Sequence, residues 1–284
     1  MGPKGAFFDS PVPRPSSYSR SCTSTHTRAR PTAGVVEPIS DNWSTEQRPQ
    51  PPSGRRKQEM ETLLFDLDGT LYPLDNGYHI HVRQNMWRFM SDKLGIEEPE
   101  KVWRPLFQKY NQSAKGLRVG GGYEFDLEDF WTSVRAGAAD FIKEAPPGVK
   151  SALEKLPQKD KYVFTNCNEV EAEEALALLG IRHHFKGVIG AKAMGETCKP
   201  DKAAFEGVLQ SAGADPAKTV MFEDSFKNLV TAKSLGMSTV FVQSDTAREE
   251  GVGSVELDTV DAVVCDVSEE ELRAKAPWLW VGDR

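Results

Sequence analysis

Residues 62–70 read Thr-Leu-Leu-Phe-Asp-Leu-Asp-Gly-Thr. The first four form a strand-sized apolar run that is typical of a buried parallel strand. Asp66 and Asp68 follow where such a strand passes into a turn, and Gly69 lets the backbone curl beneath them. Two carboxylates at this spacing can face one site, and their repulsion is unfavourable unless a cation or a basic side chain lies between them. The stretch therefore predicts a strand with a charged site at its carboxyl end.

Apolar runs of strand length recur downstream, separated by amphipathic segments that end in glycine. The runs cover residues 161–164, 187–189, 219–222, 239–242 and 262–264. The separating segments end at Gly180, Gly213 and Gly236, residues suited to the position just after a helix. Strands that alternate with helices imply right-handed βαβ units. We therefore predict an α/β fold with a Rossmann-like, doubly wound parallel sheet.

One interval, residues 75–147, breaks this alternation because it shows helical patterns without a convincing strand. We interpret it as a helical cap inserted after the first strand. The core then comprises residues 59–74 and 148–265, and residues 266–284 form a C-terminal tail. The helices predicted in the cap cover residues 79–94, 101–110 and 127–141.

Residues 1–58 differ in composition from the rest of the chain. They are crowded with Pro, Ser, Thr and Arg, and they hold nine Lys and Arg against four Asp and Glu. This is poor material for a core, so we predict a disordered segment. Its composition also resembles that of an organellar transit peptide, and the excess of Ser, Thr and Pro favours a chloroplast over a mitochondrion. The alternative is a disordered tail of a cytoplasmic protein.

Charge and composition limit the classes of partner. The 284 residues carry a net charge of −7, and the acidic charge is concentrated after residue 58. The part of the chain after residue 58 lacks the positive electrostatic potential that binding of polymeric nucleic acid requires, so any phosphorylated ligand that it binds should be a small molecule. No apolar run approaches the ~20 residues that span a bilayer, which argues against a membrane protein. The four cysteines are too scattered for a disulfide scaffold and fit a reducing compartment.

Polar residues follow several of the predicted strands. Thr165 and Asn166 place a hydroxyl and an amide just before a helix, which is a natural phosphate cradle. Lys199 stands at the entry to the next helix, and Glu223 and Asp224 end another strand. Functional groups in open α/β folds lie at the carboxyl ends of the strands. We expect these basic, hydroxyl and acidic groups to converge there.

Taken in order, four motifs resemble those of the haloacid dehalogenase-like hydrolase superfamily. They are residues 65–70 (Phe-Asp-Leu-Asp-Gly-Thr), 164–166 (Phe-Thr-Asn), 199–200 (Lys-Pro) and 222–225 (Phe-Glu-Asp-Ser). The resemblance covers roughly residues 60–250 and implies an aspartyl-phosphate mechanism with Mg²⁺ as cofactor. True dehalogenases of this fold lack the second aspartate, so Asp68 favours phosphoryl chemistry.

The resemblance also assigns roles. It makes Asp66 the nucleophile and Asp68 the acid and base, with Lys199 offsetting the charge on Asp66 and the phosphate. Phosphate oxygens would be held by Thr165, by the backbone of Asn166 and by Lys199. The metal would be bound by Asp66, the Asp68 carbonyl and Asp224, with Glu223 and Asn228 in its outer shell. Glu223 and Asn228 stand where many relatives carry Asp, which leaves the detailed metal geometry open.

Four stretches look like the pyrimidine 5′-nucleotidase-like group of plants and fungi: residues 71–74 (Leu-Tyr-Pro-Leu), 116–118 and 123–126 in the cap, and 222–228. That likeness implies a nucleoside monophosphate such as UMP or CMP as substrate, with Arg118 and Tyr123 of the cap as candidate contacts. Three alternatives stay open: a phosphatase for another small metabolite (a sugar phosphate, phosphoglycolate or a cofactor phosphate), a phosphomutase, and a non-catalytic regulatory protein on the same fold. Cys167 and Cys198 flank two of the motifs, and we hypothesise that their oxidation suppresses turnover.

Overall fold

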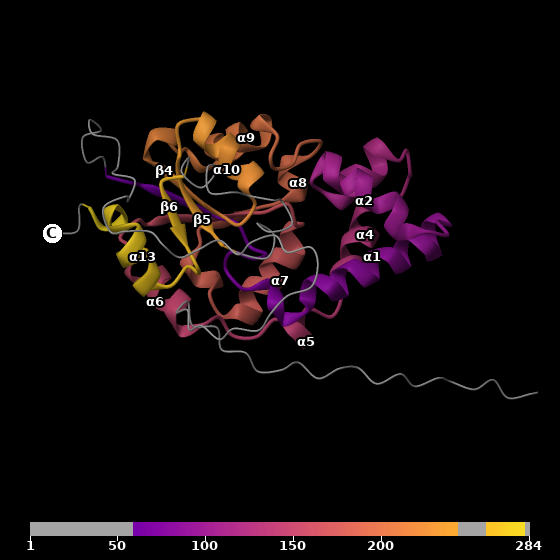
Figure 1. The fold of residues 1–284 in the computed structure, drawn as a ribbon, viewed down its shortest axis with the longest axis horizontal. Coiled ribbons are helices and arrows are strands. Elements are labelled where there is room, and N and C mark those ends of the chain that lie inside the picture. Colours follow the sequence, from indigo (N-terminus) through magenta and orange to yellow (C-terminus); the bar gives the residue numbers. More distant parts are fainter. Residues whose placement is uncertain (1–58, 244–259, 282–284) are drawn as a thin grey trace, which may run out of the picture. The chain divides into compact units, whose positions relative to one another are not determined.

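The computed structural model describes residues 59–243 and 260–281, all of which belong to one compact unit. Its centre is a six-stranded, wholly parallel sheet in the order β3-β2-β1-β4-β5-β6 (Figure 1). The strands are β1 (Thr62–Phe65), β2 (Asp160–Phe164), β3 (Gly187–Ile189), β4 (Thr219–Glu223), β5 (Ser238–Val242) and β6 (Ala262–Val264). The predicted fold class is confirmed, and β1 lies between β2 and β4.

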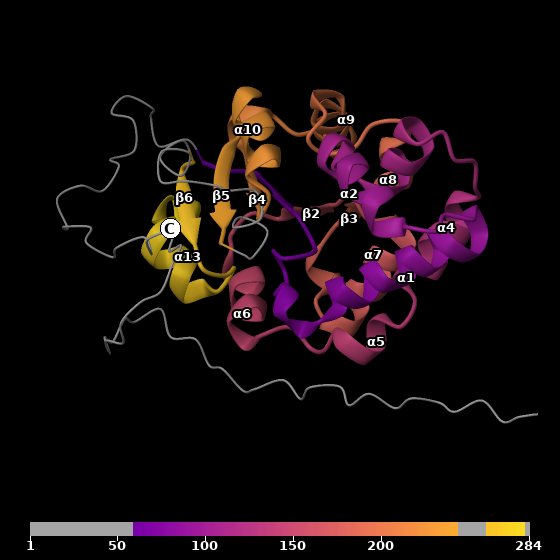
Figure 2. The same ribbon diagram turned by 45° about the vertical axis from the view of Figure 1, so that its right-hand side comes forward.

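Helices cover both faces of the sheet, as the near-continuous apolar strands require. One face packs on α6 (Pro147–Lys155), α7 (Glu169–Leu179) and α13 (Glu269–Lys275), and the other on α9 (Lys202–Ala212) and α10 (Phe226–Ser234) (Figure 2). Neighbouring residues of β1 divide between the two faces: Leu63 and Phe65 belong to the first cluster and Leu64 to the second. All three are fully buried.

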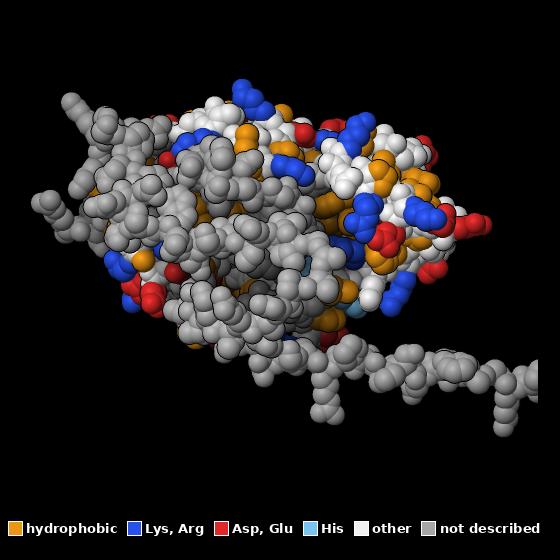
Figure 3. Space-filling model, viewed as in Figure 1, with side chains coloured by type: hydrophobic (Ala, Val, Ile, Leu, Met, Phe, Trp, Pro, Cys, Tyr) orange, Lys and Arg blue, Asp and Glu red, His pale blue; other side chains and the backbone are white. Residues whose placement is uncertain are grey.

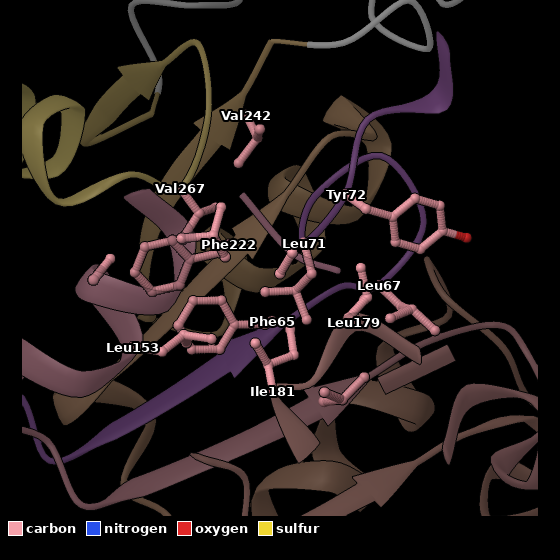
Figure 4. Close-up of a cluster of buried hydrophobic side chains, with 14 of the residues drawn as sticks. Phe65, Leu67, Leu71, Tyr72, Leu153, Leu179, Ile181, Phe222, Val242 and Val267 are labelled. Carbon is pink, nitrogen blue, oxygen red and sulfur yellow. The ribbon is translucent and has the colours of Figure 1, made fainter. Parts of the chain in front are cut away.

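The first cluster centres on two aromatic rings from adjacent strands. Phe65 and Phe222 lie opposite each other in the parallel register, and their rings stack with centroids 4.3 Å apart. Such a pair contributes about 0.5–1.5 kcal/mol beyond the burial of its surface. The ring of Tyr72 lies at the edge of this cluster and directs its hydroxyl out of it (Figure 4). The residues just before Asp66, the candidate nucleophile, and Glu223, a candidate for the outer shell of the metal, are therefore firmly packed.

A helical insertion separates β1 from β2, as predicted. It contains α1 (Tyr78–Leu94), α2 (Pro99–Tyr110), α3 (Ser113–Lys115), a π-helical turn (Gly116–Gly120), α4 (Leu127–Arg135) and α5 (Ala138–Phe141). Its own apolar core includes Met90 and Phe130, both fully buried. The structure differs from the sequence prediction at residues 127–141, where one helix was expected. Gly137 adopts a left-handed φ of 83° there and ends α4 at Arg135.

The end of the described chain packs on the core. Residues Pro277–Trp280 form a short 3-10 helix whose Leu279 is fully buried. Gln158 donates a hydrogen bond to the Leu279 carbonyl at 2.6 Å. The exact limits of core, cap and tail stay predictions. The predicted disordered segment, residues 1–58, lies outside the described residues, and with it the predictions of a transit peptide and a chloroplast destination.

The surface of the cap carries basic and acidic side chains close together (Figure 3). They include the exposed pairs Lys93–Asp129 and Arg104–Glu100. Among residues 59–243 and 260–281, none of the helices has the length and apolar character needed to cross a bilayer.

Candidate active site

Three charged side chains meet at the carboxyl edge of the sheet. Asp66 follows β1, Glu223 ends the neighbouring strand β4, and Lys199 precedes α9. The Lys199 ammonium donates to Asp66 Oδ1 at 2.6 Å, to Glu223 Oε2 at 2.7 Å and to the Phe164 carbonyl at 2.7 Å. Lys199 and Glu223 are each only 1% exposed and Asp66 is 6% exposed. Lys199 is therefore the basic group beside Asp66, and it lies between Asp66 and Glu223.

Burial sets the protonation behaviour of this cluster. Burial, reinforced by the charge of Glu223, raises the pKa of Asp66 to about 7 despite the nearby ammonium. Burial likewise raises the pKa of Glu223 to about 7, against the opposing effect of Lys199. For Lys199 burial alone would lower the pKa, but the two carboxylates outweigh it and raise the value to about 12. The lysine stays charged, while the carboxyl groups gain protons near neutrality.

Asp66, Glu223 and Asp224 form a buried acidic group whose candidate ligand oxygens all lie within 4.8 Å of one another. Oxygen donors of this kind suit a hard divalent cation. Asn228 adds a buried Oδ1 that has no hydrogen-bond partner among the described residues and lines the same cavity. Glu223 is already engaged, because its oxygens accept from Lys199 and from the Ser225 N–H at 3.2 Å. The donor set fits Mg²⁺, with Asp66 and Asp224 as its first candidates.

The turn after β1 approaches Asp224 closely. Gly69 has a φ of 85°, and a Cβ at this position would lie 2.2 Å from Asp224 Oδ2. Only glycine combines this backbone conformation with this proximity. The glycine of the Asp-Leu-Asp-Gly-Thr stretch thus makes room for the acidic group.

Replacing Gly69 by alanine is expected to lower kcat about 10²-fold and to weaken Mg²⁺ binding, because Asp224 must move away from the new methyl group. Gly95→Ala is the matched control. Gly95 also has a left-handed φ, 67°, but nothing lies within 4 Å of its added Cβ. It should cost about 1–2 kcal/mol of stability and leave kcat unchanged. Steady-state kinetics and Mg²⁺ titration compare the two variants, and equal effects would contradict the steric explanation.

Asp68 faces the cap. Both of its carboxylate oxygens accept from Arg135 Nη2, at 2.7 Å and 3.1 Å, and Tyr72 donates its hydroxyl to Oδ1. Arg135 lies at the end of α4 and is only 8% exposed. Sequence reasoning missed this residue because it belongs to none of the four motifs. The available signal was Gly137, which marks a helix end just after an arginine.

Thr165 and Asn166 follow β2, as predicted, but their side chains make structural contacts. The Thr165 hydroxyl oxygen accepts from the Cys167 N–H at 3.1 Å. The Asn166 amide donates to the Lys199 carbonyl at 2.9 Å and to the Asn111 carbonyl at 3.2 Å, and its oxygen accepts from the Lys199 N–H at 2.8 Å. The Asn166 side chain therefore ties two loops and the cap together, so a phosphate-binding role falls to its backbone.

The cap contacts this edge through two more amides. Asn111 donates to the Lys199 carbonyl at 3.3 Å, and Gln112 donates to the Asn166 carbonyl at 3.1 Å. A cavity of about 600 Å³ lies between the sheet edge and the cap helices. Its lining includes every predicted core site residue: Asp66, Asp68, Thr165, Asn166, Lys199, Glu223, Asp224 and Asn228. The structure thus brings the four motifs together.

The two predicted cap contacts lie elsewhere. Arg118 is exposed on the π-helical turn, and Tyr123 packs against the apolar core of the cap. Neither lines the cavity, whereas Arg83, Trp103 and Phe107 do. The placement gives no support to substrate contacts by Arg118 and Tyr123.

The thiols near the site are poorly suited to oxidation. Burial raises the pKa of Cys167 to about 12 and that of Cys198 to about 11. Cys167 is 4% exposed and Cys198 is fully buried. Reactive cysteines are exposed thiolates, so this geometry argues against the redox hypothesis.

Comparison with known proteins agrees with the site. The haloacid dehalogenase-like hydrolase family matches residues 60–236. The glyceraldehyde 3-phosphate phosphatase of Methanothermobacter thermautotrophicus is 31% identical over 219 residues, which cover 73% of this chain and 96% of that protein. The fructose-1-phosphate phosphatase of Escherichia coli is 35% identical over 192 residues, covering 64% and 95%. Phosphoglycolate phosphatases are also among the relatives.

A solved structure shares the fold. The crystal structure of a HAD phosphatase from Thermococcus onnurineus matches with a TM-score of 0.53 at 21% identity, covering 76% of this chain and 97% of that one. The relatives favour sugar phosphates or phosphoglycolate over the nucleotides that the motif likeness implies. The chain belongs to the haloacid dehalogenase-like hydrolases, and within them it is a phosphoric monoester hydrolase for small phosphorylated metabolites.

Proposed function

We propose that this enzyme hydrolyses a small sugar phosphate through an aspartyl-phosphate on Asp66. The observation that carries the mechanism is the buried cluster of Asp66 with Lys199, beside Asp224 at the edge of the sheet. The names of the relatives support the substrate class, because two of them are phosphatases for a triose and a hexose phosphate.

In the first step an Asp66 oxygen attacks phosphorus, a new P–O bond forms, and the bond to the ester oxygen breaks. The Asp68 carboxyl gives its proton to that oxygen, so the alcohol leaves neutral. Lys199 holds Asp66 in place and offsets negative charge as the phosphoryl group approaches. In the second step water attacks phosphorus and gives a proton to Asp68, and the phosphoryl–Asp66 bond breaks to release phosphate.

A bound Mg²⁺ supplies positive charge that offsets the charge on the phosphoryl oxygens. Asp66 and Asp224 would hold it, with Asn228 Oδ1 available to water bound to the ion. The burial of Asp66, Lys199 and Asp224 strengthens the electrostatic interactions that these side chains make.

The test is a panel of phosphate esters read by release of inorganic phosphate, at equal concentration and with Mg²⁺. The panel contains triose and hexose phosphates, phosphoglycolate, UMP, CMP and a hexose 1-phosphate. We expect the highest kcat/KM for a sugar phosphate. A higher value for phosphoglycolate or a nucleotide would overturn the substrate class, and conversion of hexose 1-phosphate to its isomer without phosphate release would indicate a phosphomutase.

A pyrimidine nucleotide is the second candidate, and one observation favours it. Trp103 and Phe107 line the cavity as a stacked pair with ring centroids 5.0 Å apart, and Phe107 is 37% exposed. An exposed aromatic face can stack on a base. Phe107→Ala should lower kcat/KM for UMP at least tenfold if UMP is the substrate, and it should affect a triose phosphate much less.

Removal of divalent ions with EDTA should abolish turnover, and Mg²⁺ should restore it. Affinity for Mg²⁺ should fall as the pH is lowered below 7, because the candidate ligand Asp66, with a pKa of about 7, is then protonated and must lose its proton to accept the ion. The expected loss is about tenfold per pH unit below 7 for each proton displaced. Calorimetric titration at pH 6 and pH 8 in two buffers of different ionisation enthalpy measures both affinity and proton release. Equal affinity at the two values would contradict the assignment.

A further inference from the structure

Arg135 connects the cap to the carboxyl group that the proposed mechanism uses as acid and base. It comes from the end of α4, yet its guanidinium reaches Asp68 Oδ2 at 2.7 Å and Oδ1 at 3.1 Å. The Arg135 side chain is 9% exposed and that of Asp68 is 30% exposed. This is a partly buried, charge-assisted contact, a class of hydrogen bond that is shorter and stronger than neutral ones.

The segment that carries Arg135 is itself held in place. Tyr78 donates its hydroxyl to the Arg135 carbonyl at 2.8 Å, and the Arg135 guanidinium lies 5.3 Å from the centroid of the Tyr78 ring. Asn85 donates to the Val134 carbonyl at 3.2 Å. The left-handed residue Gly137 then turns the chain away into α5. The guanidinium therefore approaches Asp68 from a fixed direction.

These contacts define the orientation of the Asp68 carboxyl without using all of its hydrogen-bond acceptor positions. Oδ1 accepts from Arg135 and from Tyr72, whereas Oδ2 accepts from Arg135 alone among the described groups. Each carboxylate oxygen has two lone pairs, so Oδ2 retains one that is available to a proton. Because Arg135 and Tyr72 both donate to it, the Asp68 carboxyl cannot rotate freely. The remaining lone pair of Oδ2 therefore points in a fixed direction.

We propose that Arg135 is a positioning residue, which aims the carboxyl of Asp68 at the leaving-group oxygen. This role rests on the proposed function. In the first step the proton leaves Asp68 for the ester oxygen as the P–O bond breaks, and Arg135 keeps all of its protons. Arg135 acts through Asp68, and since it belongs to the inserted helices, it makes proton transfer depend on the cap lying against the core.

The leaving group provides a readout that a merely structural role would not move. An alkoxide needs a proton as it departs, whereas p-nitrophenolate is stable without one. The value of kcat/KM reports the steps up to formation of the aspartyl-phosphate and departure of the leaving group. A misaligned acid should therefore lower kcat/KM for alkyl phosphates and largely spare p-nitrophenyl phosphate.

The experiment measures kcat and KM of the full chain with Mg²⁺ for the best alkyl phosphate of the ester panel and for p-nitrophenyl phosphate. Arg135→Gln should lower kcat/KM for the alkyl ester on the order of 10²-fold, which is within the range of general acid catalysis. For p-nitrophenyl phosphate, the same variant should lower kcat/KM less than about fivefold. Arg135→Lys, which keeps the charge but loses the planar guanidinium, should lower kcat/KM for the alkyl ester about tenfold. Asp68→Asn should show the same selectivity.

The control is Arg182→Lys, because Arg182 pairs with Glu173 outside the cavity. This variant should leave kcat/KM unchanged for both esters. Retained hydrolysis of p-nitrophenyl phosphate shows that the Arg135 variants are folded. Equal losses for both substrates would overturn the proposal and make Arg135 structural. A gain with the alkyl ester would also overturn it, because Arg135 would then restrain Asp68. If Asp66→Asn cleaved either ester at the normal rate, the proposed function itself would fail.

Discussion

Replacement of Asp66 by asparagine is expected to lower kcat by about 10⁴-fold or more, because an amide cannot form the bond to phosphorus that the carboxylate forms. The protein should still fold. Burial raises the pKa of Asp66 from its ordinary value of 3.8 to about 7, so the folded state binds this proton more tightly than the unfolded chain. The contribution of Asp66 to stability is therefore present at low pH and lost as the pH rises through 7. Without divalent ions at pH 8, the variant should melt no lower than the wild type.

Asp92→Asn is the control, since Asp92 is exposed on α1, and it should leave both activity and melting unchanged. Phosphate release gives the activity, and intact-mass measurement after treatment with beryllium fluoride tests whether the carboxylate can be trapped. An Asp66→Asn variant with ordinary turnover would exclude the covalent mechanism.

The second large effect is expected at Lys199. Lys199→Met removes the ammonium from between two buried carboxyl groups and also leaves the Phe164 carbonyl without this donor. We expect kcat to fall about 10³-fold, because the charge that offsets the phosphoryl oxygens is lost. The free energy of unfolding at pH 8 should fall by about 3–5 kcal/mol, the usual cost of breaking a buried pair by removing one partner. At pH 6 the loss should be smaller, because Asp66 and Glu223 are then largely protonated.

Lys202→Met makes the same chemical change three residues later. Lys202 pairs with Glu206 on the surface of α9, where its side chain is 64% exposed, and such pairs contribute about 0–1 kcal/mol. Denaturant unfolding at the two pH values and steady-state kinetics compare the variants. If Lys199→Met were as active and as stable as Lys202→Met, Lys199 would not hold the nucleophile.

The sheet could be predicted from the sequence because its strands are buried on both faces. The strands Thr62–Phe65 and Thr219–Glu223 are buried along their whole length and each has three consecutive apolar residues, and acidic residues stand at their carboxyl ends: Asp66 directly after the first and Glu223 as the last residue of the second. Local composition is then enough to place a strand and to place a charge at its end. The parallel order puts β2, β1 and β4 side by side, which brings together groups more than a hundred residues apart.

The cap side of the site could not be predicted in the same way. Arg135 reaches Asp68 because α4 ends at Arg135, just before Gly137, and the helical pattern of residues 127–141 conceals that end. The role of the Asn166 side chain depends on the distance between loops that belong to different motifs. The preference for a sugar phosphate over a nucleotide rests on relatives, because the motifs describe the phosphoryl half of the substrate that all such enzymes share.

Asn111, Gln112 and Asn166 form a seam of three amide hydrogen bonds between the insertion and the edge of the sheet. At about 1 kcal/mol each, they favour the joined arrangement by on the order of 3 kcal/mol, so on their account the seam is open roughly one part in a hundred of the time. A ligand that passes between the cap and the edge of the sheet can do so only in the open arrangement. Opening must also break the Arg135–Asp68 and Lys115–Asp201 ion pairs, so charged and uncharged contacts together hold the cap against the core.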